Sequence, residues 1–437
     1  MTRVTLYHLF LVILLLLGLL KPASDSLIDL FIGFFIFSLV SYVVLQQKRL
    51  IISLVFIIAW IIFSVIQGFE LIIIYGSLAG LATAILFEKY KFLKISAIFL
   101  LIFLYLISSW LNSENLRAIL TQDLSKFAYN NDPGLYLKTY YFMGQNLDYY
   151  ESYKMAFLNR FETQIIPKDV WSWRMPTLFV IWQLMPGKYG LSIYYLFLLF
   201  ASLVLYTAYK IGKKYLGVSL AILPAYLIFP YLHFAARDQM FLITEWWSMS
   251  LFVFGVYLLT THKFFWATLV FSLTLMIREL YTLPIALMLI YSFFARRKIV
   301  SVYIIPLFAF LVLFFSHVYR LSFYIDSWGT IFSPRIVSDG LFFIQQTLAF
   351  GSWEYLLFQL RPFLFFFFAS IVGCLYILRK TNREESILWI LGYLPFILAF
   401  LRFGQTPFND YWGIVYVPIT IILAPLSLGL FKQRPKV

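Results

Sequence analysis

Asp132 lies in a polar stretch, Tyr129–Tyr136, of a chain that is otherwise strongly apolar, and it opens the tripeptide Asp-Pro-Gly that is typical of a turn. A carboxylate within hydrogen-bond reach of a hydroxyl group can act as a general base. Arg278 and Glu279 form a second ionisable pair, which separates two apolar runs. A guanidinium group matches the geometry of phosphate, and ionisable residues at such a position are functional candidates. The other elements of the chain must position these groups.

The composition indicates that lipid is the solvent for most of this chain. Hydrophobic residues make up 62% of its 437 residues, charged residues only 12%, and the mean hydropathy is +0.86. A soluble domain carries roughly 25% charged residues, so one soluble core cannot bury this much apolar surface. The net charge of +14 comes from short basic clusters between apolar runs. That placement indicates membrane topology and gives no support to a nucleic-acid partner.

Several classes of site find no support in the sequence. Cys374 is the single cysteine, so neither an intramolecular disulfide nor a cysteine-ligated metal site is expected. The histidines show no HExxH spacing, and neither a P-loop nor a GxGxxG fingerprint occurs. The first apolar run, Leu6–Leu20, lacks a well-formed cleavage site, which favours a retained helix over a signal peptide.

The fold class expected from these runs is an all-α polytopic membrane protein of about 14 transmembrane helices with two long extracytoplasmic loops, because a spanning helix needs roughly 20 apolar residues. The predicted runs are 5–20, 27–46, 50–66, 70–87, 93–110, 190–209, 217–233, 240–260, 264–278, 282–295, 299–316, 361–378, 386–401 and 411–431.

The basic residues set the predicted orientation. More than half of the 34 Lys and Arg residues fall in connections assigned to the cytoplasm, where both termini are then expected. The short outside connections hold only Lys21, Arg237, Arg278 and Arg402. Because short cytoplasmic loops are enriched in Lys and Arg, the chain is expected to be a multi-pass protein of the plasma (inner) membrane, with its polar loops outside.

The runs 264–278 and 282–295 are expected to form a hairpin with its tip at Met276–Tyr281. As one helix they would span roughly 48 Å, which is too long for a bilayer. As two arms of about 21 Å each, they place Arg278 and Glu279 at the floor of an outward-facing cavity. Ionisable groups at such depth are costly unless they pair or line water.

The first outside loop, 111–189, is the least hydrophobic part of the chain. Apolar residues recur in it at helical spacing in two segments, at Leu116, Ile119, Leu120, Leu124 and Phe127, and at Met155, Leu158, Phe161 and Ile165. Both segments are predicted to be amphipathic helices, either along the membrane surface or in a small water-facing cap. The segment Pro176–Met185 is apolar but too short to span, and is predicted to be re-entrant or interfacial. For the second outside loop, about 317–360, the sequence leaves open whether it closes over a substrate or packs on the first loop.

The succession of these motifs resembles the GT-C glycosyltransferases, polytopic enzymes that use polyprenyl-phosphate sugars. Asp132, Tyr136 and Gly144 match an outside segment of that family with Asp, Tyr and then Gly. Its Arg-x-Pro-x-Leu segment is matched by Arg174-Met175-Pro176-Thr177-Leu178. Two later outside motifs resemble Thr244-Glu245-Trp246 and Arg278-Glu279-Leu280.

The resemblance implies a GT-C-like catalytic core over 93–316, preceded by N-terminal transmembrane helices in 1–92. The second outside loop and the C-terminal helices then occupy 317–437. The chain departs from the family pattern in having four spans ahead of the catalytic-type loop, where many members have one. It also lacks an Asp-Asp or Asp-Glu doublet, so the use of a divalent cation, Mg²⁺ or Mn²⁺, stays open.

The activity that the resemblance implies is transfer of a sugar from a polyprenyl-phosphate donor to a glycan, lipid or protein acceptor on the extracytoplasmic face. Asp132 is expected to be the catalytic base. The expected substrate-binding residues are Tyr136, Arg174, Asp238, Glu245, Arg278, Glu279, Arg320 and Arg402. Helix capping or pairing with Arg237 is an equal alternative for Asp238 and Glu245, and a structural role is the ordinary alternative for each arginine.

Three other functions stay open at this point. A lipid-linked glycan polymerase uses similar substrates, commonly through loop arginines. A transporter or flippase usually buries charged residues near mid-membrane, and the spanning runs here are nearly free of them. A structural scaffold is the third alternative, since Gly76 and Gly80 form a GxxxG pattern that is typical of helix packing.

Overall fold

The fold is known from a computed structural model, which describes residues 131–160, 166–186, 190–217, 220–237, 239–295, 299–325, 339–351, 362–381, 383–404 and 409–431, together with Tyr129 and a few residues between 98 and 110. The chain divides into two compact units, Met1–Phe103 with Ser352–Pro362, and Leu104–Gly351 with Phe363–Val437. Nearly all of the described residues belong to the second unit. The predicted runs between residues 5 and 87 lie outside the described residues.

Every regular element in the described part of the chain is a helix, as the sequence predicts. The loop 111–189 contains α7 (Asp132–Met143), α8 (Tyr149–Leu158), the short 3₁₀ helix η2 (Val170–Ser172) and α9 (Thr177–Gln183). The predicted segment from Leu116 to Phe127 lies outside the described residues. Of the second predicted segment, the residues up to Leu158 belong to α8, and residues 161–165 lie outside the described residues.

Each apolar run predicted from residue 190 onward overlaps with helical structure among the described residues. These elements are α10 (Leu191–Leu216), α11 (Leu223–Ala235), η4 (Met240–Leu242), α12 (Thr244–Thr260), α13 (Phe264–Ile277), η5 (Glu279–Tyr281), α14 (Thr282–Phe294), α15 (Ser301–Leu321), α16 (Leu341–Ala349), α17 (Pro362–Lys380), α18 (Arg383–Phe400), η8 (Asp410–Val415), α19 (Val417–Leu423) and η9 (Ala424–Phe431).

Three stretches of described helix are long and apolar enough to cross a membrane, judged by length and composition: Leu191–Leu216, Ser301–Leu321 and Asp410–Leu430. The helical stretches Leu223–Ala235, Phe264–Ile277 and Glu279–Phe294 are apolar but shorter. The last two are short because the chain breaks at Arg278, whose backbone is extended between α13 and η5. The described residues thus contain far fewer helices of spanning length than the sequence predicts for the whole chain.

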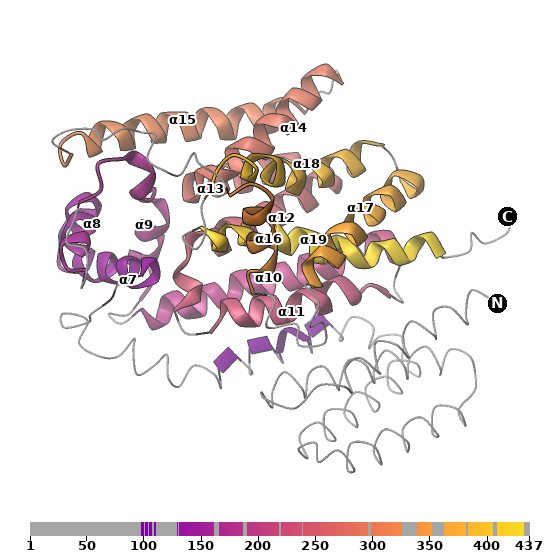
Figure 1. The fold of residues 1–437 in the computed structure, drawn as a ribbon, viewed down its shortest axis with the longest axis horizontal. Coiled ribbons are helices and arrows are strands. Elements are labelled where there is room, and N and C mark those ends of the chain that lie inside the picture. The colour runs from indigo at the N-terminus through magenta and orange to yellow at the C-terminus, as the bar shows by residue number, and fades with distance from the viewer. Residues whose placement is uncertain are drawn as a thin grey trace, which may run out of the picture. The chain divides into compact units, whose positions relative to one another are not determined.

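Helix α12 is the core of the second unit. Almost all of its residues are buried, as expected for a helix that is apolar on every side. It packs against α10, α13, α18 and η8, and α10, α12, α13 and α18 are labelled in Figure 1. A Cβ on Gly255 would lie 2.6 Å from the Phe271 ring, so the glycine lets α12 and α13 approach closely.

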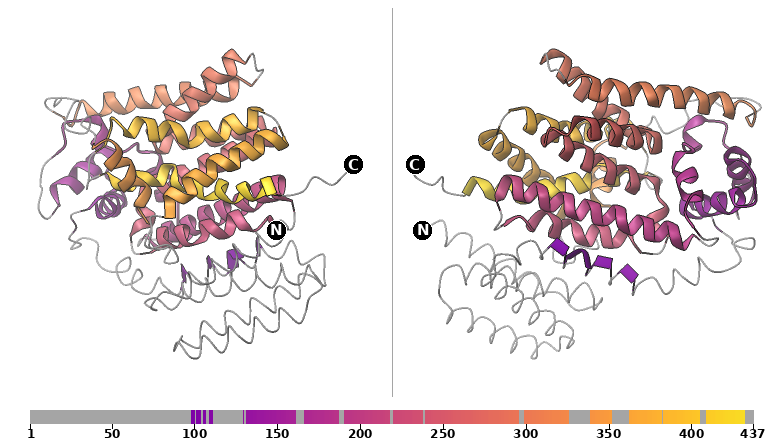
Figure 2. Two further views of the ribbon diagram at one scale, coloured as in Figure 1. Left: turned by 45° about the vertical axis from the view of Figure 1, so that its right-hand side comes forward. Right: turned by 180° about the vertical axis from the view of Figure 1, so that it is seen from behind.

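Helices α7, α8 and α9 gather at one end of this helix array (Figures 1 and 2). Packing between aromatic side chains holds them in this position. Trp182 of α9 is fully buried, and its ring centroid lies 5.8 Å from that of Trp247 in α12. Phe179, one turn earlier, packs against Tyr149 and Tyr153 of α8. The predicted re-entrant segment Pro176–Met185 is therefore a two-turn helix with one face buried against both the loop and the bundle.

The second loop, about 317–360, contributes α16, which packs against η8 and α18. The Thr347 hydroxyl lies 2.9 Å from the Tyr416 hydroxyl, and a Cβ on Gly413 would lie 1.9 Å from the Thr347 carbonyl oxygen. Residues 339–351 of this loop therefore rest on the start of the last apolar run. Its first residues instead pack on α8 of the first loop, where the Tyr150 hydroxyl lies 3.1 Å from His317 Nδ1.

Candidate functional site

Asp132 is the first residue of α7 because Asn131 caps the helix. The Asn131 side chain accepts a hydrogen bond from the Gly134 N–H at 2.8 Å, and Pro133 lies in the first turn, where its missing N–H costs nothing. A Cβ on Gly134 would lie 2.4 Å from the Cβ of Tyr129, so this close approach requires glycine. The Asp-Pro-Gly tripeptide therefore begins a helix and does not form an isolated turn.

The Asp132 carboxylate is accessible and lies at the positive end of a helix. Its side chain is 37% exposed, whereas those of its two cationic partners are 19% exposed (Arg160) and 9% exposed (Arg174). Arg160 Nη2 lies 3.1 Å from Oδ1, and Arg174 Nη2 lies 3.5 Å from Oδ2. The helix N-terminus also favours a negative charge. The arrangement keeps an acceptor oxygen near solvent while its counter-charges are mostly buried.

Arg174 is held by several acceptors from different parts of the chain. Its Nε donates to the Tyr136 hydroxyl at 2.7 Å, and its Nη1 donates to the Trp171 carbonyl oxygen at 3.0 Å. Its Nη2 donates to the Tyr411 hydroxyl at 3.2 Å. Because a guanidinium group is planar with its donors in a fixed fork, these contacts set both the position and the orientation of the charge.

The chain ahead of Arg174 is shaped by hydrogen bonds from two directions. Asp169 caps η2, accepting from the Ser172 N–H at 2.9 Å and from the Ser172 hydroxyl at 2.8 Å. The Tyr149 hydroxyl donates to the Arg174 carbonyl oxygen, and the Tyr153 hydroxyl donates to the Ser172 carbonyl oxygen at 3.5 Å. Helix α8 thereby fixes the backbone that presents the guanidinium group.

The tyrosine hydroxyls around this segment are neutral over the ordinary pH range. Burial raises the pKa of Tyr136 well above its usual value, and the charge of Arg174 opposes this only in part. Burial likewise raises the pKa values of Tyr149 and Tyr153. Tyr136 therefore remains a neutral acceptor for Arg174.

Arg278 and two carboxylates form a second, deeper ion network. Its Nε lies 2.8 Å and its Nη2 2.7 Å from Glu245 Oε1, and its Nη1 pairs with Glu279 Oε1. The side chains of Arg278 and Glu245 are only 2% and 0% exposed, whereas that of Glu279 is 15% exposed. The Thr244 hydroxyl donates to the other Glu245 oxygen at 3.0 Å. The buried charges are thus paired, as low-dielectric surroundings require.

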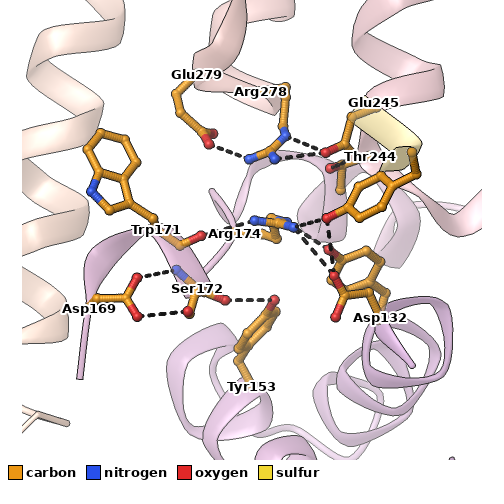
Figure 3. Close-up of polar contacts among 12 residues, drawn as sticks. Asp132, Tyr153, Asp169, Trp171, Ser172, Arg174, Thr244, Glu245, Arg278 and Glu279 are labelled. Carbon is orange, nitrogen blue, oxygen red and sulfur yellow. Dashed lines mark hydrogen bonds and ion pairs between the residues drawn. The ribbon is translucent and has the colours of Figure 1, made fainter. Parts of the chain in front are cut away.

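The two networks lie next to each other (Figure 3). Arg174 lies between Asp132 on one side and Arg278, Glu245 and Glu279 on the other. We call this group of acids and arginines, together with Arg160, the acid–arginine cluster. Its three carboxylates and three guanidinium groups come from the loop 111–189 and from the ends of α12 and α13. Tyr136, the remaining predicted residue of this region, bonds directly to Arg174.

Three predicted site residues are not part of the cluster as described. Asp238 lies outside the described residues. Arg320, at the end of α15, has its Nη2 3.4 Å from Asp148 Oδ2, and both side chains are about half exposed. Arg402 is exposed in the turn after α18. The choice of Arg320 and Arg402 rested on residue type alone, without a motif or spacing that tied them to Asp132.

The sequence analysis missed two residues that contact Asp132. Arg160 follows α8, and Tyr411 lies in η8, where its hydroxyl is 3.4 Å from Asp132 Oδ2. One signal was available for Tyr411. The segment Asn409–Trp412 is polar and lies at the start of the last apolar run, but no local spacing connects it with α7.

The cluster carboxylates are paired with arginines in the described part of the chain. No group of three His, Cys, Asp or Glu side chains is arranged there to hold a metal ion. Each cluster carboxylate instead faces a guanidinium group.

Comparisons with known proteins add no family to this description. No family model, no curated protein and no solved structure matches the chain.

Proposed function

We propose that this chain is a membrane glycosyltransferase that transfers a sugar from a polyprenyl-phosphate donor to an acceptor on the extracytoplasmic face. The observation that carries the proposal is the pairing of an accessible carboxylate, Asp132, with the buried guanidinium group of Arg174. One group accepts a proton, and the other stabilises negative charge beside it. The resemblance to GT-C enzymes at Asp132, Tyr136, Gly144 and Arg174 points to the same chemistry.

The reaction places opposite demands on the two groups. The acceptor hydroxyl attacks the anomeric carbon of the sugar, and Asp132 takes the hydroxyl proton. The bond from the anomeric carbon to the phosphate oxygen breaks, and its electron pair stays on the phosphate. The leaving polyprenyl phosphate therefore gains one negative charge. A fixed guanidinium group stabilises such a developing charge, and a site with little water strengthens the interaction.

The same proposal includes the finer architecture. It comprises about 14 transmembrane helices, cytoplasmic termini, and a GT-C-like core that begins near residue 93. The described helices of spanning length support a membrane location. Arg278, with Glu245 and Glu279, then forms the floor of the cavity behind Arg174. A lipid-linked donor reaches such a site laterally from the bilayer.

The test is transfer by the purified chain. The protein in detergent or liposomes is incubated with radiolabelled polyprenyl-phosphate hexoses and pentoses and with membrane extract as the acceptor source. We expect release of polyprenyl phosphate and a labelled product with wild type, and loss of both with Asp132→Asn. Absence of release with every donor, or wild-type transfer by Asp132→Asn, would contradict the proposal.

A lipid-linked glycan polymerase is the second candidate, because three arginines, Arg160, Arg174 and Arg278, meet in the cluster. Loop arginines are sufficient for that chemistry. Elongation of a diphosphate-linked oligosaccharide that survives Asp132→Asn and fails in Arg174→Gln would favour this function.

A further inference from the structure

Tyr411 belongs to the last described apolar segment, far along the sequence from the loop that carries Asp132. It is the second residue of η8 (Asp410–Val415) and lies at the start of that segment. Its hydroxyl accepts a hydrogen bond from Arg174 Nη2 at 3.2 Å and donates to Asp132 Oδ2 at 3.4 Å. A single hydroxyl thus bridges the two residues on which the proposed transfer depends.

The direction of both hydrogen bonds follows from the chemistry of the three groups. A guanidinium group only donates and a carboxylate only accepts, whereas a hydroxyl has one proton and two lone pairs. Tyr411 can therefore satisfy both neighbours at once, and no apolar side chain of the same size can replace it. The direct distance from Arg174 Nη2 to Asp132 Oδ2 is 3.5 Å, longer than a good charge-assisted hydrogen bond. The hydroxyl therefore adds a second link between the two residues, beside their direct ion pair.

The segment that carries Tyr411 is anchored to the elements that carry the rest of the cluster. The Tyr281 hydroxyl donates to the Val415 carbonyl oxygen at 2.9 Å, and Tyr281 closes the 3₁₀ turn that begins at Glu279. Helix η8 also packs against α12, whose first turn contains Glu245. The hydroxyl is therefore placed by the backbone that places Arg278 and Glu245.

We propose that Tyr411 is a positioning residue of the transfer reaction. It holds the Asp132 carboxylate and the Arg174 guanidinium group in a fixed relative position. The base then faces the acceptor hydroxyl, and the cation faces the leaving phosphate. The bridge is long in the absence of substrate, and catalytic hydrogen bonds commonly tighten only when the reactants are bound. This inference rests on the proposed function.

The variant that tests it is Tyr411→Phe, which keeps the ring and removes the hydroxyl. We expect kcat to fall about tenfold or more, because a hydrogen bond to a charged group is lost from the transition state. The donor KM stays within about twofold of wild type, since Arg174 keeps its other acceptors. The matched control is Tyr416→Phe, which removes a hydroxyl that bonds to Thr347 in the adjacent α16. We expect this control to keep kcat near the wild-type value.

A second measurement separates positioning from general stability. If Tyr411 acts through Arg174 and Asp132, its loss is not additive with a change of Arg174. In the Arg174→Lys background, Tyr411→Phe should lower kcat by less than about threefold. An equal fall in kcat in both backgrounds, or equal falls for Tyr411→Phe and Tyr416→Phe, would overturn the inference and leave the proposed function intact. Absence of transfer by wild type would overturn both.

Discussion

Asp132 Oδ2 lies 3.5 Å from Arg174 Nη2, so the first turn of α7 and the segment before α9 meet at one ion pair. The carboxylate is partly exposed, whereas the guanidinium group is buried and held by Tyr136, Trp171 and Tyr411. Solvent or an acceptor can approach Asp132 without displacing the cation. The pair therefore combines an open base with a fixed positive charge.

The first prediction concerns the proposed base. Asp132→Asn keeps the shape of the side chain and removes its ability to take a proton, so kcat should fall by at least about 100-fold. The measurement is the initial rate of polyprenyl-phosphate release at saturating donor. Asp148→Asn is the matched control, because Asp148 caps α8 in the same loop and Asn is an equally good cap. Equal rates for the two variants would refute the role of Asp132.

Arg174 provides the second prediction. In Arg174→Lys the positive charge remains, but an ammonium group cannot reproduce the planar fork that now meets acceptors from three elements. We expect kcat/KM for the donor to fall by about 10- to 100-fold, the loss of one or two well-placed hydrogen bonds to charge. Steady-state kinetics with varied donor checks this. Full activity of Arg174→Lys would mean that only the charge matters.

The outline of the fold could be predicted from the sequence. A long apolar segment in lipid ordinarily forms a helix, because the helix satisfies its backbone hydrogen bonds within the segment. The break at Arg278 was also predictable, since one helix through it would be too long for a bilayer. The pairing of Arg278 with Glu245 and the approach of Tyr411 to Asp132 were not. These contacts join segments that are far apart in the sequence. Local residue spacing does not predict which helix ends lie next to each other. Arg320 shows the converse case. As an arginine it was expected to bind phosphate, whereas in the structure its guanidinium group pairs with the Asp148 carboxylate.

The third prediction concerns the stability of the deep ion network. In Arg278→Gln the fully buried carboxylate of Glu245 and the partly exposed carboxylate of Glu279 lose their shared cation. Breaking such a pair costs about 3–5 kcal/mol of folding free energy. Thermal unfolding of the purified variant, followed by tryptophan fluorescence in detergent, should show a clearly lower midpoint. A midpoint equal to that of wild type would show that the network contributes little to stability.

Arg320 is the subject of the fourth prediction. Its ion pair with Asp148 is exposed, and such surface pairs contribute about 0–1 kcal/mol. Arg320→Gln should therefore leave both the unfolding midpoint and the donor KM close to the wild-type values. A donor KM raised by about tenfold or more, a loss of roughly 1.4 kcal/mol of binding, would instead return Arg320 to the list of phosphate ligands.

The fifth prediction tests the side of the membrane on which the cluster lies. Gln145 is exposed just after α7, and Thr381 is exposed between α17 and α18. Cys374 is the single native cysteine and is buried. Labelling of an introduced cysteine is therefore measured without a background signal from Cys374. In intact cells, a membrane-impermeant maleimide should label Gln145→Cys, and it should label Thr381→Cys only after permeabilisation. This follows from the distribution of Lys and Arg, which assigns the connection around Thr381 to the cytoplasm. The reverse labelling pattern would place Asp132 on the cytoplasmic side, where the proposed extracytoplasmic transfer cannot take place.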